Sequence, residues 1–88
     1  MATVQLFTTS WCPYCNRAKA LLKQRGVTDY EDIDLDAQPQ ERDRMMKLSG
    51  RTSVPQIFIN GQHIGGCDDL MALDRKGALV ALLQADAG

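Results

Sequence analysis

The sequence predicts an α/β protein in which a four-stranded mixed sheet carries helices on both faces. Two patterns along the chain lead to this prediction. Residues 3–35 read as strand, helix and strand, which makes a parallel pair joined by a right-handed crossover. Further on, Asn60-Gly61 separates two short apolar segments, and this dipeptide is typical of a two-residue type I′ hairpin. The other helical segments are then expected to cover the sheet.

The first half of the chain predicts two strands and the helix between them. Residues 3–8 are β-branched with little polar alternation, so we expect a central strand. Pro13 suits the first position of a helix, which makes Cys12 its N-cap, and Gly26 can end it. Residues 30–35 alternate like a half-exposed strand, which we place at an edge of the sheet. The apolar face of the helix consists of Ala18, Leu21 and Leu22.

The middle of the chain predicts a second helix over residues 38–48. Pro39 falls in its first turn and Gly50 stops it. We expect Met45 and Leu48 to face inward. The opposite face is charged and consists of Glu41, Arg42, Asp43, Arg44 and Lys47.

The last third of the chain predicts the hairpin and two further helices. The hairpin strands cover residues 56–59 and 62–64. A third helix is expected near residues 68–75, and Gly77 separates it from a last helical run over 79–83.

Length and composition bound the class of protein. The chain has 88 residues, of which 44% are hydrophobic and 24% charged, and this predicts a single domain spanning 1–88 with a fraying tail at 85–88. A domain of this size can fold without a metal or a disulfide. Ten Lys and Arg against eleven Asp and Glu leave a net charge of −1, which argues against nucleic acid as a partner. The short apolar runs argue against a membrane span, so we expect a monomeric cytoplasmic protein with reduced thiols.

Two cysteines, Cys12 and Cys15, lie where the first strand meets the first helix. The Cys-x-x-Cys spacing near a strand–helix–strand pattern is typical of a redox dithiol. At the N-cap, the sulfur of Cys12 lies beside free helix N–H groups, which favour the thiolate over the thiol. Cys15 comes one turn later, and we expect it to be more shielded and to hold its proton more tightly. Cys12 therefore suits the nucleophile and Cys15 the resolving thiol.

A zinc site is the alternative for the cysteine pair. By itself the motif fits a zinc half-site or a chance pair about as well as a redox centre. A structural zinc ion needs four ligands, and the chain offers only His63 and Cys67 to complete the set. His63 belongs to the predicted hairpin, and a lone Cys67 is typical of a buried or capping residue. We therefore expect no metal.

Two further segments of the sequence could bind a ligand. Val54-Pro55 begins a strand, where a cis bond would let the backbone of Val54 pair with a peptide-like molecule, although an ordinary trans strand start is the common case. Gly65-Gly66-Cys67-Asp68-Asp69 begins a helix, whose N–H groups can bind a carboxylate while Asp68 receives an ammonium. The simpler alternative is that the aspartates only cap the helix.

Together, Cys12-Pro13-Tyr14-Cys15, Ser53-Val54-Pro55 and Gly65-Gly66-Cys67-Asp68-Asp69 resemble the glutaredoxins, in particular their small bacterial dithiol members. The resemblance extends from Val4 to Leu83. It implies a thioredoxin-like fold with Pro55 in cis, and glutathione as co-substrate without a tightly bound cofactor.

The resemblance also assigns residues to glutathione. Val54 would pair with the backbone of its cysteine, and Cys67 and Asp68 would hold its γ-glutamyl end. Arg42 would meet its glycine carboxylate. The remaining groove residues would be Tyr14, Ser53 and Pro55.

Two positions depart from the family pattern. Thr9 stands where members often carry a basic residue, which removes one cation from the surroundings of Cys12. Trp11 stands where a small polar residue is common. It could contact a protein substrate or serve as a partly exposed packing residue.

The sequence thus predicts a glutathione-dependent thiol–disulfide oxidoreductase. Its substrates would be glutathionylated proteins, through Cys12 alone, and protein disulfides, through Cys12 and Cys15. One rival is an iron–sulfur carrier in which two chains share a cluster, which Pro13 and the second cysteine disfavour. Another is a thioredoxin reduced by a flavin enzyme instead of glutathione.

Overall fold

The computed structural model describes residues 2–84, which form four strands and four helices. Every predicted strand and helix is present, and the predicted tail at 85–88 lies outside the described residues. In chain order the elements are β1 (Val4–Thr8), α1 (Pro13–Gln24), β2 (Glu31–Asp34), α2 (Glu41–Ser49), β3 (Gln56–Ile59), β4 (Gln62–Gly65), α3 (Cys67–Arg75) and α4 (Ala78–Gln84).

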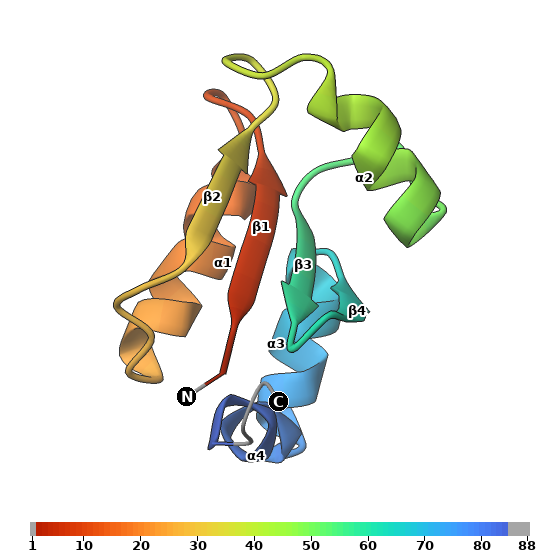
Figure 1. Cartoon of the computed structure of the whole chain (residues 1–88). Helices are drawn as coiled ribbons and strands as arrows, with labels where there is room; N and C mark the ends of the chain where they lie inside the picture. Colours follow the sequence, from red (N-terminus) through yellow and green to blue (C-terminus); the bar gives the residue numbers. More distant parts are fainter. Residues whose placement is uncertain (1, 85–88) are drawn as a thin grey trace.

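The strands form one mixed sheet in the order β2-β1-β3-β4 (Figure 1). β1 runs parallel to β2 and antiparallel to β3, and β3 runs antiparallel to β4. The predictions of a central first strand and a second strand at the edge are confirmed. Because β1 ends at Thr8 in the middle of the sheet, the loop that follows carries Cys12 to the centre of one sheet end.

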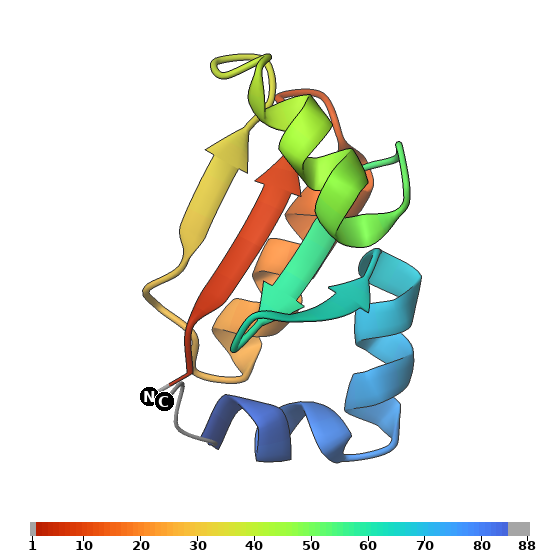
Figure 2. The same ribbon diagram turned by 45° about the vertical axis from the view of Figure 1, so that its right-hand side comes forward.

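Helices cover both faces of the sheet, as predicted, and Figure 2 shows α2 in front of it with α1 behind. Side chains that alternate along β1 enter two separate cores, because successive residues of a strand point to opposite faces. Leu6 packs under α1, α3 and α4 in a cluster that includes Leu22, Leu70 and Leu79. Phe7 points the other way, toward α2. Its cluster consists of Ile33, Leu35, Met45 and Phe58.

The turn between β3 and β4 has the predicted type I′ geometry. Asn60 has a φ of 53° and Gly61 a φ of 77°, so both central residues are left-handed. Gly77, with a φ of 76°, separates α3 from α4 as expected. The residues at these positions therefore predicted both the hairpin turn and the end of α3 correctly.

Helix α2 begins at Glu41, three residues later than predicted. Gln38 precedes Pro39, and the proline ring disfavours helical backbone angles for the residue before it. The chain forms a turn there instead, in which Glu41 N–H donates to the carbonyl of Gln38 over 3.0 Å. The other end is as predicted, since Gly50 is left-handed and closes the helix.

The prediction that Leu48 faces inward is wrong, because its side chain is 53% exposed. Met45 is fully buried and reaches the cluster around Phe7, as predicted. Among the described residues α2 is the one helix on this face of the sheet, so its last turn has no second helix to pack against.

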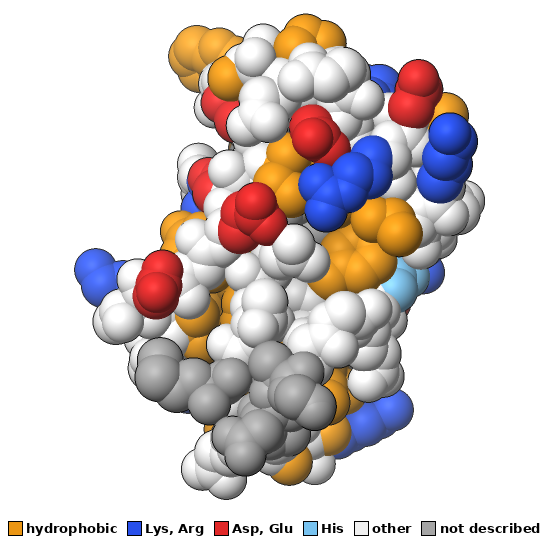
Figure 3. Space-filling view, in the orientation of Figure 1, with side chains coloured by type: hydrophobic (Ala, Val, Ile, Leu, Met, Phe, Trp, Pro, Cys, Tyr) orange, Lys and Arg blue, Asp and Glu red, His pale blue; other side chains and the backbone are white. Residues whose placement is uncertain are grey.

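Acidic and basic side chains are interspersed over the face shown in Figure 3. This face therefore presents no extended field of one sign. Within residues 2–84, no helix combines the length and the apolar character needed to cross a bilayer.

Candidate functional site

The cysteine pair lies at the start of α1, and Cys12 is its N-cap as predicted. Cys12 is extended, with φ −118° and ψ 103°, and its sulfur accepts a hydrogen bond from the backbone N–H of Cys15 over 3.2 Å. Pro13 occupies the first turn, where its missing N–H costs no hydrogen bond. The Cys15 N–H and the positive end of the α1 dipole thus lie where they would stabilise a negative sulfur at Cys12. The ionisation of Cys12 itself stays a prediction.

Cys15 is more shielded from solvent than Cys12, as predicted. Its side chain is fully buried, whereas Cys12 keeps 9% of its surface exposed. Burial is the main reason that the pKa of Cys15 is raised to about 12, and the hydrogen bond with Cys12 adds to it. Cys15 is therefore a protonated thiol at neutral pH.

Cys67, the third cysteine, is also buried, at the first position of α3. Burial, together with the charge of neighbouring Asp68, raises its pKa. Its sulfur lies 3.8 Å from the sulfur of Met71. All three cysteines are free thiols.

We expect iodoacetamide at pH 7 to label Cys12 well before the other two cysteines. The reagent needs an accessible thiolate. Cys12 is the most exposed of the three at 9%, whereas Cys15 and Cys67 are more deeply buried and have raised pKa values. Peptide mass spectrometry of briefly labelled protein measures the order. Labelling of Cys15 at the same rate as Cys12 would contradict it, and labelling in denaturant, where all three should react alike, is the control.

The loop before β3 approaches the sulfur of Cys12. The Val54–Pro55 peptide bond is cis, as the resemblance implies. The carbonyl oxygen of Val54 lies 3.7 Å from the sulfur of Cys12, which donates to it as a weak thiol hydrogen bond. Segments 42 residues apart in sequence therefore meet at Cys12.

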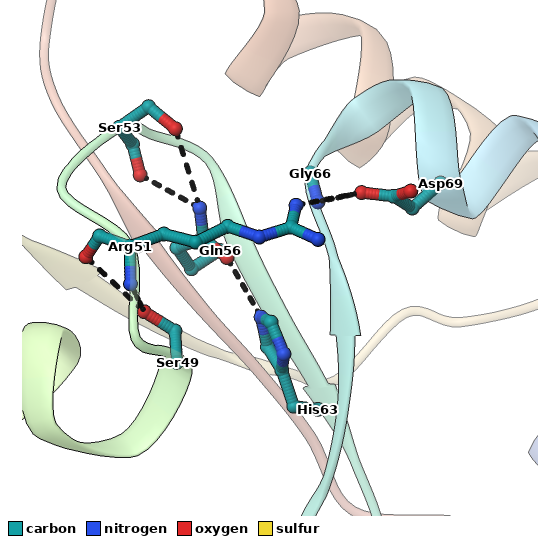
Figure 4. A network of polar contacts seen from close by, with 7 residues as sticks. All are labelled: Ser49, Arg51, Ser53, Gln56, His63, Gly66 and Asp69. Carbon is teal, nitrogen blue, oxygen red and sulfur yellow. Dashed lines mark hydrogen bonds and ion pairs between the residues drawn. The ribbon is translucent and has the colours of Figure 1, made fainter.

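A chain of side-chain hydrogen bonds supports this loop from below (Figure 4). Gln56 is fully buried, and its Nε2 donates to the carbonyl oxygen of Ser53 over 2.9 Å. Its amide oxygen lies 2.8 Å from Nε2 of His63 in β4, and since that oxygen can only accept, the ring nitrogen donates. The His63 ring also packs on Phe58, with centroids 5.0 Å apart. His63 thus belongs to the support of the loop.

We expect Gln56→Ala to lower the free energy of unfolding by about 1–3 kcal/mol, because it leaves the Ser53 carbonyl and His63 without their buried partner. Urea unfolding followed by circular dichroism measures this. Gln62→Ala is the matched control, since Gln62 is an exposed glutamine in β4. Equal losses in the two variants would contradict the role given to the hydrogen bonds.

The start of α3 is shaped by Gly65, Gly66 and Asp69. Gly65 has a φ of 122°, and a Cβ there would overlap the Asp69 carboxylate. That carboxylate accepts from the backbone N–H of Gly66 over 2.9 Å and from Arg51 over 2.9 Å (Figure 4). These two bonds lower the pKa of Asp69. The Asp69 carboxylate is thus occupied, whereas the Asp68 carboxylate is exposed and has no hydrogen bond or ion pair with a side chain or backbone group of residues 2–84.

A pocket of about 220 Å³ lies between the Val54 loop and the start of α3. Six of the predicted ligand-binding residues line it, although they come from three separate parts of the sequence. Its complete lining is Tyr14, Arg51, Ser53, Val54, Pro55, Gly66, Cys67, Asp68 and Asp69. The structure therefore gathers these residues beside Val54, which contacts Cys12.

Two arginines differ from what the sequence suggested. Arg42 does not line the pocket, and its guanidinium donates to the carbonyl of Thr52 over 3.5 Å. Arg51, which sequence reasoning missed, does line the pocket and connects the loop to α3 through Asp69. In the sequence, Arg51 is recognisable only as a cation two residues before Ser53. That position alone does not predict a contact with the pocket.

Tyr14 and Trp11 border the cysteines on the solvent side. Tyr14 is 53% exposed and the guanidinium of Arg17 lies 5.4 Å from its ring centroid. Trp11 is 94% exposed, so it is not a packing residue of this chain. Among residues 2–84, no group of three His, Cys, Asp or Glu side chains lies close enough together to hold a metal ion.

Comparison with known proteins agrees with this geometry. The glutaredoxin family model matches residues 4–64. The chain is 55% identical over 84 residues to glutaredoxin 3 of Escherichia coli strain K12, covering 96% of this chain and 100% of that protein. It is 52% identical over 85 residues to a glutaredoxin of Pseudomonas aeruginosa, covering 97% of this chain and 100% of that protein.

The same fold is found in a crystal structure of a buckwheat glutaredoxin–glutathione complex. The TM-score is 0.84 at 36% identity, and the match covers 93% of this chain and 76% of the buckwheat chain. The fold is accordingly thioredoxin-like. With two free cysteines at the start of α1 and a match over nearly the whole chain, the protein belongs to the glutaredoxin family of thiol–disulfide oxidoreductases.

Proposed function

We propose that the protein uses glutathione to reduce mixed disulfides between glutathione and proteins, and that it also reduces protein disulfides. The observation that carries this proposal is the contact of the Cys12 sulfur with Val54, which is part of the pocket wall. A disulfide whose backbone lay along Val54 would present its sulfur to Cys12. A reducing cytoplasm, which the sequence predicts, would supply the reduced glutathione.

The pocket fits the chemical groups of glutathione. Backbone groups of Val54 can pair with the cysteine of the tripeptide as a short added strand. The γ-glutamyl end carries an ammonium and a carboxylate, which suit the free carboxylate of Asp68 and the N–H groups at the start of α3. Arg42, which lies outside the pocket lining but donates to Thr52 beside Ser53, stays the proposed partner of the glycine carboxylate. The buckwheat relative, solved with glutathione, supports this choice of ligand.

The first route needs Cys12 alone. Its thiolate attacks the glutathione sulfur of a glutathionylated protein, a bond forms between Cys12 and glutathione, and the protein sulfur leaves and takes up a proton. A second glutathione thiolate then attacks the glutathione sulfur bound to Cys12. Oxidised glutathione leaves and Cys12 is regenerated.

The second route needs both cysteines. Cys12 attacks a protein disulfide and forms a mixed disulfide with one of its sulfurs. Cys15 then attacks Cys12, releases the reduced protein and closes an intramolecular disulfide. Two glutathione molecules reduce this bridge. Cys12 and Cys15 are close together at the start of α1, where the Cys15 N–H contacts the Cys12 sulfur. This proximity favours closure of the intramolecular disulfide.

The test measures turnover of a glutathione mixed disulfide with either glutathione or a flavin-dependent thioredoxin reductase as the source of electrons. We expect turnover that depends on glutathione. Asp68→Asn should raise the KM for the mixed disulfide about five- to tenfold, roughly 1–1.4 kcal/mol of binding. Asp43→Asn, which removes an exposed charge from α2 outside the pocket, is the matched control. Turnover with the flavin enzyme alone would overturn the proposal.

A further inference from the structure

A polar network lies beside Cys15 on the sheet face that α1 covers. Nζ of Lys19 lies 2.6 Å from Oδ2 of Asp32, and the Thr8 hydroxyl donates to Oδ1 of Asp32 over 2.5 Å. Thr8 is buried, while the side chains of Lys19 and Asp32 are 26% and 35% exposed. None of these three residues has a part in the two routes described above.

Helix geometry places Lys19 next to Cys15. Lys19 follows Cys15 by four residues in α1, and residues at this spacing are neighbours on a helix surface. Asp32 lies in β2, the edge strand beside β1, and pairs with Leu6 in register. The ion pair therefore holds the ammonium of Lys19 against the sheet instead of leaving it extended into solvent.

Cys15 lies near the same sheet end. It is in the first turn of α1, which follows β1 after the loop of residues 9–12, and its side chain is fully buried. Both the thiol and the Thr8–Asp32–Lys19 network are thus found where β1 ends. Within residues 2–84, the charges that shift the pKa of Cys15 are those of Lys19 and Cys12. The charges that shift the pKa of Lys19 are those of Asp32, Tyr30 and Cys15.

The charges favour a cation at this position. Burial raises the pKa of Cys15 to about 12, and the ammonium of Lys19 opposes that rise. Burial by itself would lower the pKa of Lys19, but the hydrogen bond and charge of Asp32 outweigh it and raise that pKa. Lys19 is therefore positively charged throughout the neutral range.

We propose that Lys19, held by Asp32, is a positioning residue for the resolving step, in which its ammonium stabilises the thiolate of Cys15. The inference rests on the dithiol route of the proposed function. In this step the Cys15 thiolate attacks the Cys12 sulfur, the Cys12–Cys15 bond forms, and the bond from Cys12 to the substrate breaks. The substrate sulfur leaves with the electron pair and takes up a proton, so that the proton lost by Cys15 is balanced. The substrate disulfide is the oxidant.

The experiment follows the resolving step directly. Reduced protein is converted to a mixed disulfide between Cys12 and glutathione, and the closure to the intramolecular disulfide is followed between pH 6 and 9 by acid quenching and mass spectrometry. A second series uses the mixed disulfide with 2-mercaptoethanol, which does not need the glutathione pocket. The variants are Lys19→Gln, Lys19→Arg and Asp32→Asn. Lys23→Gln removes an exposed lysine one turn further along α1 as the matched control.

We expect Lys19→Gln to slow closure about three- to tenfold in both series, because a lower thiolate fraction is only partly offset by higher intrinsic nucleophilicity. Its rate–pH profile should move to higher pH. Lys19→Arg should restore most of the rate, Lys23→Gln should leave it unchanged, and Asp32→Asn, which keeps the cation, should slow it less than Lys19→Gln.

Equal slowing by Lys19→Gln and Asp32→Asn with an unmoved pH profile would reduce Lys19 to a structural role, and an unchanged Lys19→Gln rate would overturn the inference. If the original protein closes from the 2-mercaptoethanol disulfide but does not turn over glutathione disulfides, the proposed function fails while the Lys19 comparison still decides the inference.

Discussion

Replacing Cys12 with serine is expected to reduce both reactions, on glutathione mixed disulfides and on protein disulfides, to the rates measured without protein. Each route begins with the Cys12 sulfur as nucleophile, and a serine hydroxyl stays protonated at neutral pH. Loss of the nucleophile corresponds to a decrease on the order of 10³-fold or more. Coupled assays of glutathione-dependent turnover, with a glutathionylated peptide and with a protein disulfide, measure it.

The Cys12→Ser variant should remain folded. Cys12 is an N-cap, and serine is among the preferred residues at that position, so its hydroxyl can accept the hydrogen bond from the Cys15 N–H. Circular dichroism and urea unfolding check this. A folded Cys12→Ser protein with undiminished turnover would refute the assignment of the nucleophile.

Replacing Cys15 with serine is expected to separate the two routes. Reduction of glutathione mixed disulfides should stay within about threefold of the original rate, because a second glutathione takes over the step after Cys12. Reduction of protein disulfides should be lost, since no thiol remains to attack the mixed disulfide at Cys12. The same two assays as for Cys12→Ser give the ratio of the two rates.

Cys15 is fully buried, so the serine variant needs its own stability measurement. A buried hydroxyl without a partner costs about 1–3 kcal/mol, and the assays should be run where the variant is fully folded. Loss of both activities in a folded Cys15→Ser protein would contradict the monothiol route. Retention of protein-disulfide reduction would contradict the resolving role.

Much of the fold could be predicted because local rules determine it. Pro13 fixes its own φ at a value that suits a helix start, and Asn60-Gly61 and Gly77 permit the left-handed backbone of a turn, and all three behave as expected. The predicted start of α2 at residue 38 is wrong because Pro39 disfavours helical backbone angles at Gln38. The same chain segment shows that the rule for the residue before proline has priority.

Side-chain placement was less predictable than the elements. Met45 and Leu48 are three residues apart and share one face of the predicted helix, yet of the two only Met45 is buried. Periodicity indicates which residues share a helix face, but it does not tell how much of that face a sheet will cover. The missed Arg51 has the same explanation, because its partner Asp69 is 18 residues away.

The sequence by itself determined the chemistry of this protein: two thiols one helical turn apart at a helix start, with Val54-Pro55 before β3 and a glycine pair before α3. These are properties of a few neighbouring residues, and local backbone energetics express them directly. Only the tertiary structure decided that Val54 meets Cys12, that Arg51 reaches Asp69, and that Lys19 pairs with Asp32. Such contacts depend on strand order, register and helix packing, which result from many distant contacts acting together.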